Sequence, residues 1–368
     1  MAGPRYTSLV KTLPSTVPFV GPETQERGMG RKFQARIGAN ESVFGPSPAA
    51  VRAMAEAAAG SWRYGDPENH DLKQALAETL GVAAENIVIG EGIDALLGYL
   101  ARMLIGEGTP VVTSLGAYPT FNFHVSGFGG VLHAAPYAAD REDPEALLAL
   151  AEATGAPLIY FSNPDNPMGT VHPADTVQDL IDRVPEGALL ILDEAYGEFA
   201  PDGTAPPIDV SNDRVIRFRT FSKAYGMAGA RIGYGIGEAG LVNSFNKIRN
   251  HFGVNRIAQA GALASLADRD HVPRVRAEVS RACARIAAIA RESGLLPIET
   301  AANFVAVDCG RDGVYAKAVL AALADQGVFV RMPGIAPQNR CIRISAGTDA
   351  DLDVLARALP IALQAASR

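Results

Sequence analysis

The chain has 368 residues, of which 48% are hydrophobic and 20% charged, and its formal net charge is −7. A chain of that length can bury a sizeable core and suits one large domain with a smaller one. The acidic balance disfavours nucleic acid or an anionic membrane as a partner. The N-terminus has no apolar targeting segment and no apolar run is long enough to span a bilayer, so we expect a cytoplasmic protein.

Three widely spaced cysteines, Cys283, Cys309 and Cys341, form no CxxC pair and have no histidine at metal-ligand spacing. Reduced thiols fit this pattern better than disulfides or a zinc site. We therefore expect no metal.

Residues 1–45 are rich in Pro and Gly, and we expect an arm that joins the smaller domain. Helices are predicted over 49–60 and 71–80. Short apolar runs then alternate with helical patterns, at 86–90, 110–113, 157–162, 188–192, 215–218 and 232–236. Continuous apolar runs joined by helices indicate strands buried on both faces of a mainly parallel sheet. The pattern predicts an α/β large domain over 46–265.

The pattern changes in the C-terminal part, which we assign to a smaller α+β domain over 266–368. A long helix rich in Ala and Arg begins near residue 273 and a second helix covers about 315–326. Apolar runs at 303–309, 327–332 and 341–346 read as strands. Such a mixture of helices and strands is typical of a separate small domain.

Chemically active side chains follow several of the predicted strands. In open α/β sheets, ligands bind beyond the carboxyl ends of the strands, so these groups should share one rim. Together they provide a lysine, a carboxylate, an amide, a phenol and a glycine-rich turn. Pyridoxal phosphate needs a lysine amine, a carboxylate for its ring nitrogen and a phosphate site, so this cofactor fits the rim.

Lys223 is the only lysine at a strand end, and we expect it to hold the cofactor covalently. Asp193 ends the most apolar strand, where an unpaired carboxylate is costly, so it is predicted to pair with the ring nitrogen. A helix cap is its alternative role. Tyr196 and Asn166 are expected to face the ring's phenolic oxygen, although a turn would also explain Asn166. Tyr118 could lie flat on the ring or be an ordinary core tyrosine.

The cofactor's phosphate is predicted to lie between two segments. Ser222 and Arg231 can reach it, because a guanidinium fork suits a permanent dianion. The other segment opens a predicted helix, whose free N–H groups and dipole favour an anion. Its residues are Gly92, Ile93 and Asp94.

Two glycine patterns suggest a rival, a nicotinamide-dependent dehydrogenase. Gly90-x-Gly92-x-x-Ala95 and Gly235-x-Gly237-x-x-Gly240 match a dinucleotide fingerprint, which wants an acidic residue at the end of the next strand. The strand after the first match ends at 113–115 without an acid. The stretch 241–262 after the second is expected to continue as helix. Neither match therefore supports dinucleotide binding. The first match suits a single phosphate.

The motifs resemble those of fold-type-I, class I and II aminotransferases, and are most similar to the histidinol-phosphate aminotransferase branch. The resemblance covers about residues 40–348. It rests on NESVFGPSP (40–48), WRYGDP (62–67), GEGID (90–94), NPDNPMG (163–169), DEAYGEF (193–199), TFSKAYGMAGARIGY (220–234), NHFGVNRIAQAGA (250–262), NF (303–304) and VRMPG…CIRISAGT (330–348).

This resemblance implies further roles. Tyr64 falls where the family reaches into the neighbouring subunit's phosphate site, which implies a homodimer with shared active sites. Asn40 lies in the segment that closes over the substrate. Arg343 matches the arginine that binds a substrate carboxylate, although a lone strand arginine is more often a salt-bridge partner. Arg331 matches an arginine that binds a substrate phosphate in histidinol-phosphate enzymes and that related members keep with other substrates. In a departure from the family pattern, Met168 stands where threonine is usual.

The predicted activity is transfer of an amino group to a 2-oxo acid such as 2-oxoglutarate (EC 2.6.1.-). The donor is expected to be histidinol phosphate or an aromatic amino acid. Decarboxylation of an amino acid of the phosphothreonine type is the alternative, because it occurs on a very similar scaffold and differs only in which bond of the α-carbon breaks.

Overall fold

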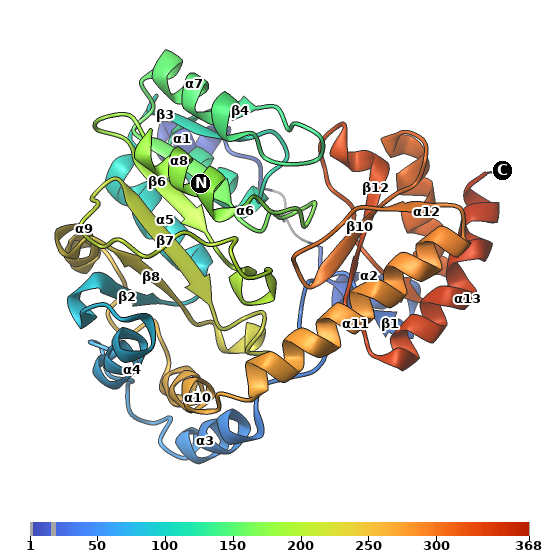
Figure 1. Cartoon of the computed structure of the whole chain (residues 1–368), viewed down its shortest axis with the longest axis horizontal. Coiled ribbons are helices and arrows are strands. Elements are labelled where there is room, and N and C mark those ends of the chain that lie inside the picture. The colour runs from blue at the N-terminus through green and yellow to red at the C-terminus, as the bar shows by residue number, and fades with distance from the viewer. Residues whose placement is uncertain (1–2, 16–19, 368) are drawn as a thin grey trace.

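A computed structural model describes residues 3–15 and 20–367. The parts of the predicted arm at 1–2 and 16–19, and residue 368 of the predicted small domain, lie outside the described residues. Figure 1 shows a large sheet flanked by helices on the left and a smaller helix-and-strand unit on the right, with the long helix α11 (orange) running between them.

The large sheet has seven strands in the order β2-β8-β7-β6-β5-β3-β4. Neighbours from β7 to β4 are parallel, while β8 runs antiparallel to both β2 and β7. The mainly parallel sheet predicted from the apolar runs is thus confirmed. The strands are β2 (Ile87–Gly90), β3 (Pro110–Ser114), β4 (Val131–Ala135), β5 (Leu158–Ser162), β6 (Leu189–Asp193), β7 (Val215–Thr220) and β8 (Gly233–Gly237).

Both faces of this sheet are covered, which explains why its strands are apolar throughout. Along β5, Leu158 and Tyr160 pack on the side of α5 and α6, while Ile159 and Phe161 pack on the side of α7 and α8. The helices of this part are α3 (Pro48–Ala58), α4 (His70–Leu80), α5 (Ile93–Leu104), α6 (Pro119–Gly127), α7 (Pro144–Thr154), α8 (Ala174–Asp182), α9 (Ala239–Ser244) and α10 (Arg256–Ala267). Strand β4 escaped prediction because it is an edge strand with only Ala135 fully buried.

The expected continuous helix over 241–262 is wrong. Helix α9 ends at Ser244, and a short 3-10 turn and a loop precede α10. Two features are found where the helix is interrupted. The side chain of Asn255 caps α10 by accepting a hydrogen bond from the Ala258 N–H. Gly253 lies so close to the Glu91 carboxylate that a Cβ there would collide with it.

The smaller unit packs around its own core. Its sheet has the order β12-β10-β9. The elements are α11 (His271–Glu292), β9 (Leu296–Pro297), β10 (Phe304–Asp308), α12 (Gly313–Asp325), β11 (Val328–Phe329), β12 (Cys341–Ser345) and α13 (Asp349–Ala366). The described part of the N-terminal segment contains α1 (Ser8–Thr12), α2 (Pro22–Met29) and β1 (Ala35–Arg36).

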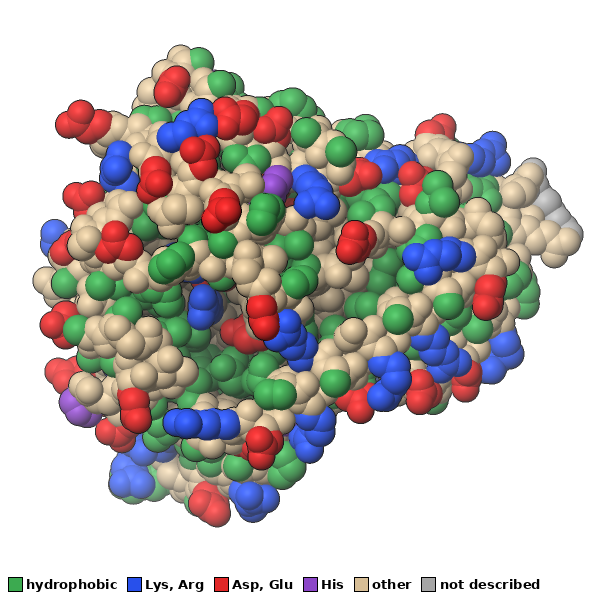
Figure 2. Space-filling model, in the orientation of Figure 1, with side chains coloured by type: hydrophobic (Ala, Val, Ile, Leu, Met, Phe, Trp, Pro, Cys, Tyr) green, Lys and Arg blue, Asp and Glu red, His purple; other side chains and the backbone are tan. Residues whose placement is uncertain are grey.

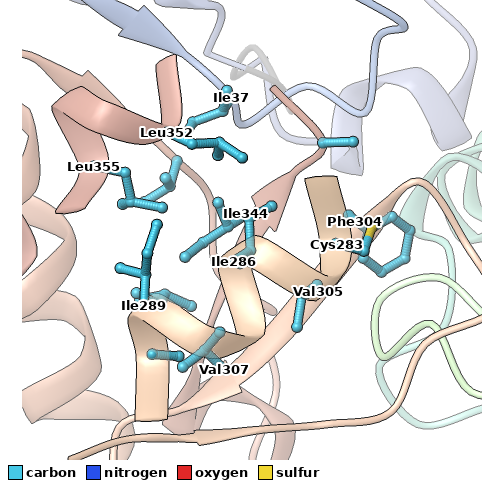
Figure 3. Packing of buried hydrophobic residues seen from close by; sticks show 14 of the residues in the cluster. Ile37, Cys283, Ile286, Ile289, Phe304, Val305, Val307, Ile344, Leu352 and Leu355 are labelled. Carbon is cyan, nitrogen blue, oxygen red and sulfur yellow. The ribbon is translucent and has the colours of Figure 1, made fainter. Parts of the chain in front are cut away.

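The N-terminal segment joins this smaller core. Strand β1 pairs in parallel with β11. Figure 3 shows Ile37 beside Leu352, with Ile286 and Ile344 in the same group of buried side chains. The core of the smaller unit also includes Tyr196, Phe199 and Ala224 of the larger part, and the predicted domain division at residues 265 and 266 stays a prediction.

Within the described ranges, no helix is long and apolar enough to cross a membrane. The face seen in Figure 2 carries Lys and Arg side chains interspersed with Asp and Glu. The three cysteines are free and buried.

Candidate active site

A cavity of about 990 Å³ lies at the carboxyl ends of β3, β5, β6 and β7, and side chains of the smaller unit close its far wall. This is the rim where the sequence predicted the site. Twelve of the predicted residues line it, namely Asn40, Ile93, Asp94, Tyr118, Asn166, Asp193, Tyr196, Ser222, Lys223, Arg231, Arg331 and Arg343. Gly92 adjoins them as the N-cap of α5.

Lys223 follows β7 and lies in the cavity wall. Its Nζ donates a hydrogen bond to the Asn40 carbonyl oxygen at 3.0 Å and lies 5.5 Å from the ring centre of Tyr196. Burial, followed by the nearby Arg343 guanidinium, lowers the pKa of this amine to about 8. A lowered pKa leaves more of the amine uncharged near neutral pH, as a nucleophile requires.

Asp193 is the last residue of β6 and is almost fully buried. Its Oδ2 accepts a hydrogen bond from the Tyr160 hydroxyl at 2.6 Å, and its Oδ1 accepts one from the Ala195 N–H at 2.9 Å. Burial raises the pKa of the carboxyl to about 6. A cation placed against it would stabilise the ionised form, so the site suits a protonated ring nitrogen.

The predicted phosphate position combines a helix start with a guanidinium. Gly92 caps α5 with a φ of +86°, and a Cβ at this position would lie 2.6 Å from Nη2 of Arg231. Both the close approach and the left-handed backbone therefore require glycine. Ser222 is buried on the opposite segment, where its N–H donates to Thr220 Oγ1 at 3.0 Å. Helix N–H groups, a hydroxyl and an arginine form a suitable anion site.

Tyr118 is fixed by the start of α5. Its hydroxyl donates to Asp94 Oδ1 at 2.8 Å, and Asp94 Oδ2 lies 3.6 Å from Arg231 Nη2. Burial, followed by the Asp94 charge, raises the pKa of the Tyr118 phenol well above its ordinary value. The phenol thus stays protonated while its ring lines the cavity.

Two amides converge on the Tyr196 hydroxyl. Asn40 Nδ2 donates to it at 2.9 Å, and Asn166 Nδ2 lies at 3.5 Å. Asn40 is buried with a φ of +54°, and its N–H donates to Ser345 Oγ at 2.9 Å. Arg343 Nη1 donates to Asn166 Oδ1, so Asn166 bridges the phenol and the arginine.

Arg331 and Arg343 form an isolated antiparallel bridge, through hydrogen bonds between their backbones. Burial lowers the pKa of both guanidinium groups, and for Arg343 the neighbouring Arg331 charge also contributes. Two guanidinium groups in one cavity wall favour a ligand with two negative charges.

Tyr64 is not brought together with the other predicted residues. Its side chain is 76% exposed and its ring packs against Phe252, with 4.7 Å between ring centres. It does not line the cavity of its own chain.

Three residues of this site had no predicted role. Tyr160 bonds to Asp193, Thr220 lines the cavity beside Ser222, and Asn303 Nδ2 donates to the Asn40 carbonyl oxygen at 3.1 Å. Tyr160 is a lone phenol in an otherwise apolar strand that precedes Asn166, which was a usable signal. The contact of Asn303 with Asn40 joins segments 263 residues apart and left no local signal.

The residues present fit pyridoxal phosphate. A buried carboxylate faces the cavity at one point, a lysine amine with a lowered pKa at another, and an anion site at a third. Each feature matches one part of the cofactor, namely its ring nitrogen, its aldehyde and its phosphate.

Comparison with known families decides the assignment. Residues 34–359 match the family model for aminotransferase class I and II. The chain belongs to this family. It is therefore a pyridoxal-phosphate-dependent aminotransferase with the predicted fold, and neither dinucleotide fingerprint reflects its cofactor.

Individual relatives agree with this membership. A histidinol-phosphate aminotransferase from Sinorhizobium meliloti, solved in complex with pyridoxal-5′-phosphate, is 55% identical with a TM-score of 0.96, covering 99% of this chain and 98% of that chain. The histidinol-phosphate aminotransferase of Moorella thermoacetica is 33% identical over 360 residues, which is 97% of this chain and 92% of that protein. The histidinol-phosphate aminotransferase of Jannaschia sp. is 35% identical over 325 residues, which is 88% of this chain and 89% of that protein.

Proposed function

We propose that this aminotransferase moves an amino group from histidinol phosphate to a 2-oxo acid such as 2-oxoglutarate. The pairing of Arg331 with Arg343 carries the proposal. A phosphate monoester and a dicarboxylate each bring two negative charges, and one guanidinium pair can serve both half-reactions. An aromatic amino acid has a single carboxylate and would use only one of the two arginines.

The residues around the cofactor have distinct tasks in this proposal. When bound, pyridoxal phosphate supplies an electron-withdrawing ring that stabilises negative charge at the donor's α-carbon. Asp193, held by the Tyr160 hydroxyl, keeps a proton on the ring nitrogen. The Lys223 amine, oriented by the Asn40 carbonyl, moves a proton from the donor's α-carbon. Tyr196 and Asn166 orient the ring through its phenolic oxygen.

We also propose a homodimer in which each Tyr64 completes the phosphate site of the other subunit. The exposed aromatic group formed by Trp62, Tyr64 and Phe252 supports this, because large exposed apolar side chains gather at interfaces. A cytoplasmic location remains part of the proposal and agrees with three free thiols.

A donor screen tests the substrate. Histidinol phosphate, phenylalanine and tyrosine are compared by glutamate formation from 2-oxoglutarate, with carbon dioxide release measured in parallel. We expect kcat/KM to be at least about tenfold higher for histidinol phosphate, since one extra charge-assisted contact contributes about 1.5–3 kcal/mol. Equal rates with phenylalanine would refute the narrow substrate, and carbon dioxide release would favour decarboxylation.

A further inference from the structure

A buried pair of acids lies behind the cavity wall, outside the set of residues discussed so far. Glu142 is 1% exposed and Asp165 is 2% exposed. Glu142 Oε2 accepts a hydrogen bond from Ser114 at 2.7 Å, and its Oε1 accepts from the N–H and hydroxyl of Ser162. The Ser162 hydroxyl also lies 3.4 Å from Asp165 Oδ1, which accepts a hydrogen bond from Tyr137 at 2.8 Å.

Glu142 joins parts of the chain that are distant in sequence. It belongs to the loop between β4 and α7, whereas Ser114 and Ser162 end the strands β3 and β5. Its backbone oxygen also bonds to His172 Nε2 at 2.8 Å. The Glu142 side chain therefore connects the loop between β4 and α7 to the ends of β3 and β5 at the rim of the active site.

Asp165 closes the loop 163–170 upon itself. Its Oδ2 accepts the Met168 N–H at 2.9 Å, its N–H donates to the Thr170 oxygen at 2.9 Å, and its carbonyl accepts the Gly169 N–H at 3.1 Å. The residue that follows directly is Asn166, which lines the cavity. The conformation of Asp165 therefore decides where Asn166 points.

The same loop touches the smaller unit. The Gly169 oxygen accepts the Ala301 N–H at 2.7 Å, and Asn166 Oδ1 accepts a hydrogen bond from Arg343. Asn166 also lies near the Tyr196 hydroxyl. A shift of this loop would therefore move Asn166 relative to both the Tyr196 hydroxyl and Arg343.

We propose that Glu142 is a positioning residue that shares one proton with Asp165 in a neutral–anionic acid pair, and that this pair fixes the loop that carries Asn166. The chemistry of the surroundings supports one shared proton. The hydrogen-bond partners of both carboxyls are hydroxyl and backbone N–H groups, which do not neutralise a second negative charge. Two ionised carboxylates this close and this buried would repel strongly.

The proton belongs on Glu142. Burial raises the pKa of both carboxyls; the Asp165 charge raises that of Glu142 further, whereas hydrogen bonds from the Met168 N–H and the Tyr137 hydroxyl lower that of Asp165. Among the described residues, the hydrogen-bond partner of Glu142 Oε2 is the Ser114 hydroxyl, which can reverse and accept a hydrogen bond. Asp165 Oδ2 accepts from a backbone N–H, which can only donate, and its Oδ1 accepts from the Tyr137 hydroxyl, which would have to give up that hydrogen bond if Asp165 carried the proton.

Three variants of the full-length protein test this pair. Glu142→Gln imitates the protonated acid, Glu142→Ala removes it, and Glu145→Gln makes the same chemical change at an exposed position three residues away. The readouts are the dissociation constant of pyridoxal phosphate, the donor KM against kcat, circular dichroism for the fold, and infrared difference spectra of the carboxyl region.

We expect Glu142→Gln and Glu145→Gln to bind the cofactor within about threefold of wild type, whereas Glu142→Ala weakens it about tenfold or more, as for one lost buried hydrogen-bonded group. Glu142→Ala should also raise the donor KM. The wild type minus Glu142→Gln spectrum should contain the C=O band of a protonated carboxylic acid. Absence of that band at neutral pH, or equal damage by Gln and Ala, would overturn the proposal. If Glu142→Ala does not fold, the cofactor affinity and infrared spectrum of Glu142→Gln still show whether Glu142 carries the proton.

Asp165→Asn provides the reverse test. An amide at position 165 would have to keep its oxygen on the Met168 N–H and turn its NH₂ to the Tyr137 hydroxyl, which would then lose its present donor role. We expect this variant to weaken cofactor binding more than Glu142→Gln does. The opposite order would place the proton on Asp165 and refute the assignment.

Discussion

The two ends of the cavity are built in different ways. At the end proposed to hold the cofactor, Asp193 ends β6, Lys223 follows the adjacent parallel strand β7, and Tyr160 on β5 donates a hydrogen bond to Asp193. At the end proposed to bind the substrate, Arg331 and Arg343 come from the smaller unit, and Arg343 donates a hydrogen bond to Asn166. Sheet register therefore fixes the first end, whereas the second depends on how the two parts of the chain meet. The cofactor end should accordingly respond to mutation through cofactor affinity, and the substrate end through KM.

The largest effect is expected for Asp193→Asn. A buried cation that loses its partner costs about 3–5 kcal/mol, so cofactor affinity should fall by about 10²-fold to several thousand-fold. Absorbance or fluorescence titration of the cofactor-free protein measures this. Asp209→Asn, an exposed aspartate, is the control. An unchanged dissociation constant would show that Asp193 does not meet the ring nitrogen.

Arg343→Ala should act at the other end. Removing one partner of a desolvated charge pair costs about 2–5 kcal/mol, so kcat/KM for the 2-oxo acid should fall about 100-fold, mainly through KM. Arg343→Lys keeps the charge but loses the planar fork, and should recover only part of the loss. If Arg343→Ala lowers cofactor affinity and leaves KM unchanged, Arg343 does not act on the substrate as proposed.

Tyr160→Phe removes the hydroxyl that donates to Asp193 and should weaken cofactor binding about tenfold, the lower limit for a hydrogen bond to a charged group. Without that donor the pKa of Asp193 rises further above about 6. An ionised Asp193 favours the cofactor, so affinity falls as pH drops through the pKa, and in the variant this fall should begin at higher pH.

Tyr137→Phe is the matched control for Tyr160→Phe, because it also removes a buried hydroxyl that donates to a carboxylate, here Asp165. It should leave the pH dependence of cofactor affinity where it is in the wild type. An identical shift in both variants would mean that the effect is not specific to Asp193.

The smallest expected effect concerns pH and Lys223. Because burial lowers the pKa of this amine to about 8, the uncharged fraction rises as pH increases through 8. The rate at which cofactor-free protein captures pyridoxal phosphate should increase about fivefold from pH 7 to 8 and level off above pH 9. Stopped-flow absorbance measures it. A rate that keeps rising to pH 10 would indicate an amine with an ordinary pKa.

The contrast between the two ends also explains what the sequence could predict. Asp193 directly follows a predicted apolar run, and Asn166 and Lys223 come within five residues of one, so the rule that ligands meet the ends of parallel strands was enough to group them. Glu142 gave no such signal, because it lies in a loop and its partners are 20 and 28 residues away in the sequence. The assignment of Arg343 rested partly on family resemblance, because a lone arginine in a strand is more often a salt-bridge partner.

The two errors in the predicted secondary structure, at β4 and between α9 and α10, also arise from features that the local sequence does not show. Strand β4 has one fully buried residue, so no apolar run reveals it. The break between α9 and α10 depends on the approach of Gly253 to Glu91, a contact between segments more than 150 residues apart. Tertiary contacts of this kind override local helix patterns.

The central claim is a covalent bond between the ε-amine at position 223 and the aldehyde carbon of pyridoxal phosphate. Borohydride reduction of the holoenzyme, followed by proteolysis and mass spectrometry, tests it directly. We expect a pyridoxyl-phosphate adduct on the peptide that contains Lys223, and no adduct in Lys223→Ala. An unmodified Lys223 in fully loaded wild-type enzyme, or an adduct on another lysine, would contradict it.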